Sequence, residues 1–235
     1  GLLQGYLDMM GVPYGCCNVL ASALTFDKHT CNTYLKSYGV NVADSVMLIR
    51  GMAYDVNEII NEVGLPCFVK PNAEGSSFGV TKVKEAAQLE DALKKAFALC
   101  QEVLIETFID GTELTCGVVK AGDMDIAMPI AEVIPKNEFF DFEAKYDPTK
   151  SDEIIPARIS PELTNRIKTL SSMIYDILRC EGIIRVDYIV RDDEIFMLEV
   201  NTTPGMTTTS FIPQQVRAAG LDIKDVMTDI IENKF

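Results

Sequence analysis

Apolar residues recur along the 235-residue chain with two different periods, and these periods predict its secondary structure. A spacing of three to four residues predicts helices, whereas alternation or a short apolar run predicts strands. The helical spacing covers residues 2–10, 18–24, 28–38, 53–63, 85–100, 160–180, 213–219 and 222–233. Strand patterns cover residues 43–49, 67–70, 79–83, 103–108, 113–119, 125–134, 183–190 and 194–200. The strands cluster as hairpins or meanders rather than regular βαβ units, so we expect an α+β protein.

Two stretches interrupt these patterns. Residues 135–157 have no clear period and are long for a connection, so we interpret them as a functional loop or lid. A shorter break near 106–112 separates two predicted strands. At the start, Gly1 leads directly into the helical pattern without a methionine, and we expect a further segment upstream.

Composition and charge narrow the class of protein. Asp and Glu total 35 against 21 Lys and Arg, a formal net charge of −14, and no basic cluster appears, so nucleic acid is not an expected partner. No apolar run reaches the roughly 18–20 residues that would span a membrane. The seven cysteines are scattered without a Cys-x-x-Cys pair, which favours reduced thiols. We therefore expect a soluble, cytoplasmic protein.

An unusual polar pattern lies in the run MLEVNTTPGM, residues 197–206. In an extended strand Glu199 and Asn201 point to the same face. Asp187 precedes Glu199 by twelve residues, so a turn with an odd number of loop residues would set the two opposite each other, with Arg185 opposite Asn201. Carboxylate and amide oxygens without histidine or cysteine suit Mg²⁺. The alternative is a solvent-facing polar stripe with a cross-strand ion pair.

A second pattern with chemical meaning is CFVKPNAEGSSFGVTKV, residues 67–83. An apolar strand ends at Lys70, and a Gly/Ser segment follows before the next strand begins. Free amide N–H groups, hydroxyls and the lysine charge together fit a phosphate. The alternative is an ordinary turn between strands, and the segment matches neither the Walker nor the Rossmann pattern.

Two further glutamates and one histidine complete the candidates. Glu106 ends one predicted strand and Glu113 starts the next, where carboxylates can accept hydrogen bonds from an adenine amino group or from ribose hydroxyls; two solvated glutamates are the alternative. His29, the only histidine, lies at the start of a predicted helix, so a histidine-dependent triad is not expected.

Taken in order, seven segments resemble the motifs of the D-alanine–D-alanine ligases, a family of the ATP-grasp superfamily. These segments are DK, VKPNAEGSSFGV, VLIETFIDGTELT, FFDFEAKY, RVDYIV, LEVNTTPGMT and SFIPQ, and they cover nearly the whole chain. The resemblance implies an ATP-grasp fold, in which two α+β subdomains with antiparallel sheets enclose the nucleotide. It also implies synthesis of a peptidoglycan precursor of the cell wall.

The same resemblance implies a domain division. Residues 1–12 would be the end of an N-terminal substrate domain that contributes much of the first D-alanine's binding. Residues 13–106 would form the central subdomain, and residues 107–235 the C-terminal subdomain with the metal site and the lid at 135–157. Two positions depart from the family pattern: Thr203 stands where serine is usual, and Phe211 where leucine is common.

The resemblance also assigns roles residue by residue. ATP would be held by Lys28, Lys70, Glu74, Ser76, Ser77, Glu106, Glu113 and Lys145, of which Glu74 to Ser77, with Gly75, form a glycine-rich loop. Two Mg²⁺ or Mn²⁺ ions would be bound by Asp187, Glu199 and Asn201. The reacting centre would include Arg185 and the Gly205 amide as an oxyanion-stabilising pair, and Tyr146 bonded to Ser76. Ser210 and the Phe211 amide would seat the carboxylate of the second substrate.

The expected activity is ATP-dependent ligation of two D-alanines through an acyl phosphate. Tyr146 favours D-alanine as second substrate, because relatives that form D-lactate products depart from the Glu-Ala-Lys-Tyr pattern. A ligase for another amino or hydroxy acid, and a nucleotide-binding fragment without activity, remain alternatives. The partners implied are small molecules and a second copy of the chain in a homodimer, with no membrane.

Overall fold

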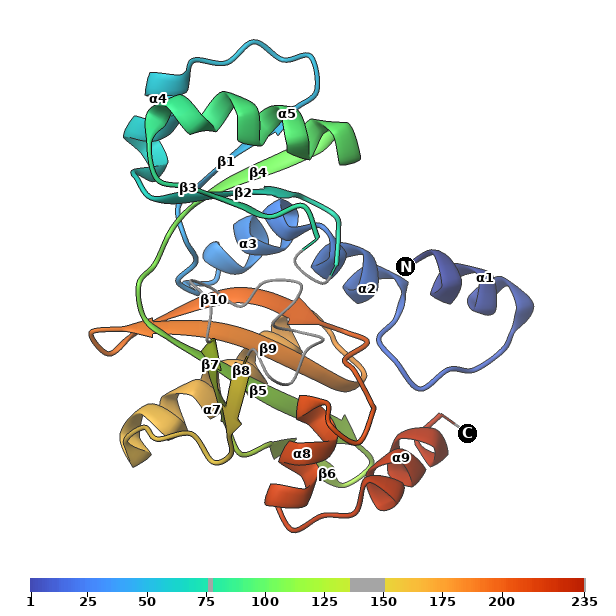
Figure 1. Cartoon of the computed structure of the whole chain (residues 1–235). Coiled ribbons are helices and arrows are strands. Elements are labelled where there is room, and N and C mark those ends of the chain that lie inside the picture. The colour runs from blue at the N-terminus through green and yellow to red at the C-terminus, as the bar shows by residue number, and fades with distance from the viewer. Residues whose placement is uncertain (76–77, 136–150, 235) are drawn as a thin grey trace. The chain divides into compact units, whose positions relative to one another are not determined.

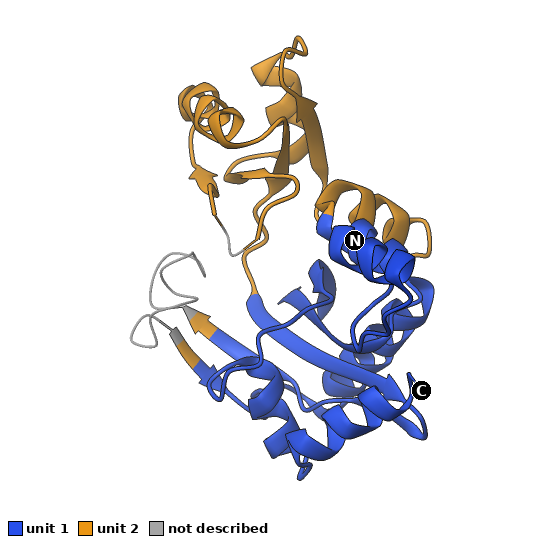
Figure 2. Cartoon of the chain, turned by 90° about the vertical axis from the view of Figure 1, so that its right-hand side faces the viewer, with its two compact units in different colours: residues 1–26, 112–133, 153–235 blue, residues 27–111, 134–152 orange. Residues whose placement is uncertain are grey.

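The computed structural model describes residues 1–75, 78–135 and 151–234 (Figure 1). The chain divides into two compact units, each with its own sheet (Figure 2). Unit 1 comprises Gly1–Phe26, Thr112–Val133 and Glu153–Phe235, and unit 2 comprises Asp27–Gly111 and Ile134–Asp152. These units differ from the predicted ranges 13–106 and 107–235, because residues 13–26 are grouped with unit 1 and residues 107–111 and 134–152 with unit 2.

Unit 2 contains a four-stranded antiparallel sheet in the order β1-β4-β2-β3. Its strands are β1 (Ser45–Ile49), β2 (Cys67–Pro71), β3 (Thr81–Val83) and β4 (Glu102–Thr107), and its helices are α3 (Lys28–Lys36), α4 (Val56–Val63), the 3₁₀ turn η1 (Ala86–Gln88) and α5 (Leu89–Leu99). Alternation along β2 buries Cys67 and Val69 against α4 and α5, which Figure 1 shows on one side of the sheet. Phe68 and Lys70 therefore project from the opposite face.

Unit 1 contains a six-stranded sheet in the order β10-β9-β5-β7-β8, with β6 also paired to β5, although residues 134–135 of β7 and 151–152 of β8 are grouped with unit 2. Its strands are β5 (Thr112–Ala121), β6 (Met124–Ala127), β7 (Ala131–Pro135), β8 (Ser151–Ile154), β9 (Gly182–Arg191) and β10 (Glu194–Asn201), and its helices are α1 (Leu2–Met10), α2 (Val19–Phe26), α7 (Pro161–Ile177), α8 (Phe211–Ala218) and α9 (Ile223–Glu232). Side chains at α-helix starts supply caps; the Ser160 hydroxyl, for example, accepts from the Leu163 amide at 3.1 Å.

The two faces of the unit 1 sheet are covered differently. Tyr188, on β9, is fully buried toward α7, where its hydroxyl lies 2.7 Å from that of Ser171. On the other face, Val119 and Ile183 form an apolar cluster with Ile212 and other residues of α8 and α9. This cluster covers one end of the face, and the polar residues described below lie farther along the same face.

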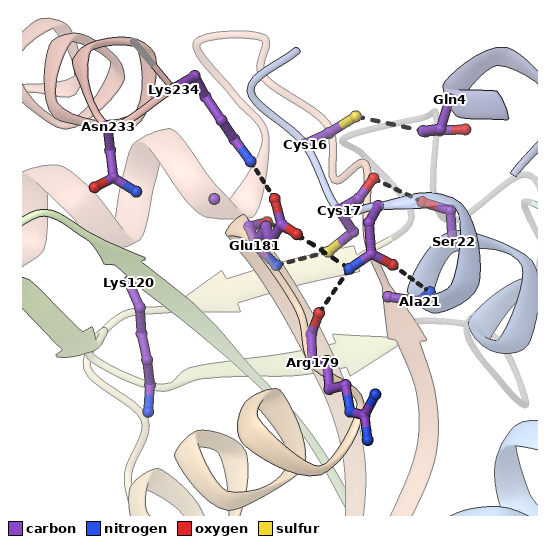
Figure 3. Close-up of polar contacts among 12 residues, drawn as sticks. Gln4, Cys16, Cys17, Ala21, Ser22, Lys120, Arg179, Glu181, Asn233 and Lys234 are labelled. Atoms are coloured by element: carbon purple, nitrogen blue, oxygen red, sulfur yellow. Dashed lines mark hydrogen bonds and ion pairs between the residues drawn. The ribbon is translucent and has the colours of Figure 1, made fainter. Parts of the chain in front are cut away.

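The segment before α2 is hydrogen-bonded to the residues just before β9 (Figure 3). Cys17 Sγ donates to the Glu181 carbonyl at 3.3 Å and accepts from the Glu181 amide at 3.4 Å. Asn18 Nδ2 donates to the Arg179 carbonyl at 3.2 Å and to Glu181 Oε1 at 3.1 Å. A hydrogen bond from the Cys180 thiol lowers the pKa of Cys17. All seven cysteines are free, as the sequence predicted.

The hairpin of β9 and β10 corrects the predicted turn. An odd number of loop residues would have paired Asp187 with Glu199 directly, but the turn has two, Asp192 and Asp193, both with positive φ (52° and 62°). This turn alone would leave Asp187 one residue out of register with Glu199. A β-bulge at Leu198 shifts the register by one residue and sets the two carboxylates opposite each other.

The predicted lid also needs correction at its ends. Pro135 is the last residue of β7, and Ser151–Ile154 form β8, so residues 135–157 are not loop throughout. The remainder of that stretch, 136–150, lies outside the described residues. The predicted strand 125–134 is divided into β6 and β7. Within the described part of the chain, no helix is both long and apolar enough to cross a membrane.

Candidate active site

The Asp187 carboxylate is the centre of a buried polar network on β9. Asp187 is 8% exposed, and the side chains of Thr115, Arg185 and Asn201 donate to its two oxygens. Oδ1 accepts from Thr115 Oγ1 at 2.6 Å and from Arg185 Nε at 2.8 Å. Oδ2 accepts from Arg185 Nη2 at 2.8 Å and from Asn201 Nδ2 at 3.0 Å. Burial opposes the charge of Arg185, but the Asp187 carboxylate outweighs it and raises the pKa of the guanidinium.

The three predicted oxygen ligands meet at the Asn201 amide. Its Nδ2 donates to Asp187 Oδ2 and also lies 3.5 Å from Glu199 Oε1. An amide is nearly symmetric, so rotation by 180° exchanges Nδ2 for Oδ1 and presents a third oxygen to the same space. Two carboxylates and one amide oxygen are ligands that a hard divalent cation prefers. Among the described residues no group of three or more His, Cys, Asp or Glu is placed to hold a metal ion, so the amide is needed to complete this set.

Residues from the loop before α8 join the same region of unit 1. The Arg185 guanidinium lies 5.4 Å from the centre of the Phe211 ring. Ser210, the residue before α8, accepts from the Thr207 amide at 3.2 Å through Oγ. A Cβ on Gly205 would lie 2.8 Å from Ser210 Oγ, so this position requires glycine or a shift of the loop. The structure thus brings Arg185, Gly205, Ser210 and Phe211 together.

Unit 2 carries a second polar group on the sheet face opposite α4 and α5. Lys70 Nζ forms an ion pair with Glu106 Oε2, and both side chains are largely buried. Asn32 Nδ2 donates to the other glutamate oxygen, Oε1, at 3.3 Å. Beside them, Lys82 Nζ lies 3.6 Å from the centre of the Phe108 ring. The face therefore offers cations and aromatic surface next to one another.

Asn72 connects the glycine-rich loop to the start of α3. It is fully buried; its Oδ1 accepts from the His29 amide at 2.9 Å, and its Nδ2 donates to Glu102 Oε2 at 3.0 Å. Lys28 Nζ donates to the Glu74 carbonyl at 2.5 Å, so Lys28 and the loop are in contact. His29 contributes its backbone amide to this contact.

Sequence reasoning missed three residues of these networks. Asn32 and Thr115 give no local signal, because their partners Glu106 and Asp187 are 74 and 72 residues away. For Asn72 the sequence offers a partial signal, because it directly follows the predicted strand that ends at Lys70-Pro71 and precedes the glycine-rich loop.

Two of the predicted nucleotide contacts lie in different units. Glu106 belongs to unit 2, whereas Glu113 lies on β5 of unit 1, opposite Ile189 and Val133. Gly75 is exposed in the loop. The remaining predicted site residues, Ser76, Ser77, Lys145 and Tyr146, lie outside the described residues.

Comparison with known proteins gives consistent matches along the chain. A family model described as D-ala D-ala ligase C-terminus matches residues 34–232. The D-alanine–D-alanine ligase of Bacteroides thetaiotaomicron is 63% identical, and that of Bacteroides fragilis (strain YCH46) 61% identical; each match covers 100% of this chain and 72% of the relative.

Solved structures agree with these sequence matches. A D-alanine–D-alanine ligase from Bacillus anthracis superposes with a TM-score of 0.86 at 33% identity, covering 100% of this chain and 75% of that one. The same kind of enzyme from Bacillus anthracis complexed with ATP gives 0.85 at 31% identity, covering 100% and 74%. The VanG D-Ala:D-Ser ligase from Enterococcus faecalis gives 0.86 at 34% identity, covering 100% and 69%.

Proposed function

The chain belongs to the D-alanine–D-alanine ligase family, and we propose that it joins two D-alanines into D-alanyl-D-alanine with conversion of ATP to ADP and phosphate. Its fold is the ATP-grasp fold of the solved ligases. The observation that carries the proposal is the convergence of Arg185 with Asp187, Glu199 and Asn201 beside the start of α8. The product is a precursor of peptidoglycan.

The chemistry requires an activated carboxylate, because a carboxylate and an amine do not condense in water. ATP converts the carboxylate of one D-alanine to an acyl phosphate, and the amine of the second D-alanine attacks its carbonyl carbon, releasing phosphate. The attack places negative charge on the carbonyl oxygen. Arg185 and the Gly205 N–H stabilise that oxygen, at about 3–4 kcal/mol for a well-aimed donor. Ser210 and the Phe211 N–H hold the carboxylate of the attacking D-alanine.

The proposed nucleotide contacts include several residues of unit 2. Lys28 and Lys70 neutralise phosphate charge, and the loop from Glu74 onward, which includes Ser76 and Ser77, donates to phosphate oxygens. Glu106 and Glu113 accept hydrogen bonds from adenine and ribose. The contacts that support the unit 2 part are the Lys70–Glu106 ion pair and the Lys28 bond to the Glu74 carbonyl. Lys145 and Tyr146 stay predictions for the closing loop.

The donor set of Asp187, Glu199 and Asn201 suits Mg²⁺ or Mn²⁺, and we propose that it binds two such ions. Bound there, the cations would supply positive charge that stabilises the transferred phosphoryl group. The chain's own contribution is to hold two carboxylates and one amide on a single sheet face, with Arg185 fixed alongside. The cytoplasm, where ATP is available and thiols stay reduced, is the proposed location. A homodimer also stays a prediction, which light scattering tests.

The proposal is tested by measuring ADP release that depends on both D-alanine and Mg²⁺, with the dipeptide identified by mass spectrometry. Glu199→Gln should lower turnover by about two orders of magnitude or more, because it removes a ligand charge and no core packing. Glu194→Gln is the matched control: Glu194 is exposed at the other end of β10, and its substitution should leave turnover unchanged. Equal turnover in both variants, or ATP binding without any D-alanine-dependent turnover, would refute the proposal.

A second candidate differs only in the second substrate. The similarity to the D-Ala:D-Ser ligase makes D-serine the competitor to test, although the identity is 34% against 61–63% for the D-alanine ligases. Equimolar D-alanine and D-serine in one assay should yield mainly D-alanyl-D-alanine. Mainly D-alanyl-D-serine would favour the second candidate.

A further inference from the structure

Thr115 donates to Asp187 and belongs neither to the metal set nor to the reacting centre. It lies on β5, a central strand paired with both β9 and β7, and it is directly opposite Asp187 in the register. Its side chain is 2% exposed, so no solvent is available to replace its hydrogen bond. At 2.6 Å, the contact of Thr115 Oγ1 with the Asp187 carboxylate is shorter than those of Arg185 and Asn201, at 2.8 Å and 3.0 Å.

The direction of that contact determines what it can do. The hydroxyl donates to Oδ1, whereas Asn201 donates to Oδ2 on the side that faces Glu199. A bond to one oxygen stops the carboxylate from rotating about the Cβ–Cγ bond, so the other oxygen keeps its direction. Arg185 donates to both oxygens of Asp187. Its guanidinium must also donate to the substrate oxyanion, whereas the Thr115 hydroxyl serves Asp187 throughout.

The backbone of Thr115 is held in place by a residue of α8. Gln215 Nε2, on α8, donates to the Thr115 carbonyl at 2.9 Å, and Gln215 is fully buried. The hydroxyl therefore starts from an anchored strand rather than from a loop. A carboxylate that binds a cation usually has such an anchored hydrogen-bond partner, whose loss costs about 10- to 100-fold in metal affinity.

We propose that Thr115 is a positioning residue for the divalent cation, and that its hydroxyl orients the Asp187 carboxylate toward Glu199 and Asn201. This inference rests on the proposed function, since it takes Asp187 as a metal ligand. It adds a residue that contacts neither substrate nor metal and acts only through Asp187.

The test uses two substitutions at one position. Thr115→Val keeps the volume and the β-branched shape but removes the donor, whereas Thr115→Ser keeps the donor. Mn²⁺ binding to the whole chain is measured by electron paramagnetic resonance in the presence of saturating ADP. We expect Thr115→Val to weaken Mn²⁺ binding by about 10- to 100-fold and Thr115→Ser by less than about 3-fold, with the Kd of ADP measured without metal unchanged in both.

The outcomes separate this inference from the proposed function. If the unmodified chain binds Mn²⁺ and Glu199→Gln abolishes binding, but Thr115→Val binds as tightly as the unmodified chain, the positioning role is refuted and the metal site stands. If the unmodified chain does not bind Mn²⁺, both fail. Should Thr115→Val not fold, Thr115→Ala replaces it, and equal affinity of the alanine and serine variants overturns the inference.

Discussion

Replacing Gly117 by alanine tests how closely α8 must approach β5. Gly117 lies on β5 opposite Arg185. A Cβ built on it would lie 2.7 Å from Ile212 Cδ1, 3.0 Å from Gln215 Oε1 and 3.3 Å from Met128 Cγ. Carbon atoms in contact normally stay about 3.5–4.0 Å apart, so the new methyl group overlaps Ile212 by roughly 1 Å.

The magnitude follows from how little room the neighbours have. Ile212 is fully buried in the apolar cluster beneath α8, so its Cδ1 cannot turn toward solvent. Overpacking of this kind typically costs about 1–3 kcal/mol of unfolding free energy. For a chain of this size that corresponds to a fall in Tm of about 2–12 °C. Because α8 begins at Phe211, a displacement of α8 should also lower kcat/KM for D-alanine. A displacement of α8 that approaches 1 Å should lower it by about tenfold or more.

A second substitution identifies the overlap as the cause. Ile212→Val removes Cδ1, and in the unmodified chain we expect it to cost about 0.5–1.5 kcal/mol. In the Gly117→Ala background the same change should cost nothing or stabilise, because it removes the atom that clashes. The coupling between the two substitutions should therefore be about 0.5–3 kcal/mol in the favourable direction.

Urea unfolding of the four variants, with D-alanine kinetics on each, measures this cycle. Gly5→Ala, in α1, is the control: its Cβ would lie 3.9 Å from Val19 Cγ2, and it should stabilise by up to about 1 kcal/mol through helix propensity. Additive effects of Gly117→Ala and Ile212→Val would refute the steric explanation. So would a Gly117→Ala variant as stable and active as the unmodified chain.

Three further predictions concern buried polar groups. Lys70→Ala should raise the Kd for ATP by about 10- to 100-fold in calorimetry, which corresponds to the loss of a charge-assisted hydrogen bond. The binding of D-alanine should not change. A variant in which only the binding of D-alanine is weakened would contradict the assigned role. Asn72→Ala should lower the unfolding free energy of the chain by about 1–3 kcal/mol, because it leaves buried backbone and carboxylate partners unpaired; an unchanged urea midpoint would argue against this. The Arg158 guanidinium holds the pKa of Glu132 below its usual value, so the pair contributes stability above the unfolded pKa that is lost as pH falls through the folded pKa. The difference in unfolding free energy between the unmodified chain and Glu132→Gln should therefore shrink as pH is lowered from 7 to about 3, and a constant difference would oppose it.

The sequence alone determined the features that depend on local periodicity. Alternation along a strand places Glu199 with Asn201 and Arg185 with Asp187 on common faces, whatever the strand later packs against. The apolar patterns predicted the α+β class, and the order of the motifs identified the ATP-grasp fold. The strand faces and the apolar periods do not change with small errors in element boundaries, because they depend on a spacing of two to four residues.

Only the tertiary structure decided how those faces meet. From the sequence, Asp187 and Glu199 would be opposite each other if the turn had an odd number of residues, but in the structure a two-residue turn with a bulge at Leu198 pairs them. Likewise, nothing near Thr115 in the sequence indicates Asp187 as its partner. Residues far apart in the chain become neighbours through the packing of whole strands and helices, and that packing depends on the summed burial of many side chains. A local pattern carries no information about that sum, so the partners of a buried polar group appear only in the fold.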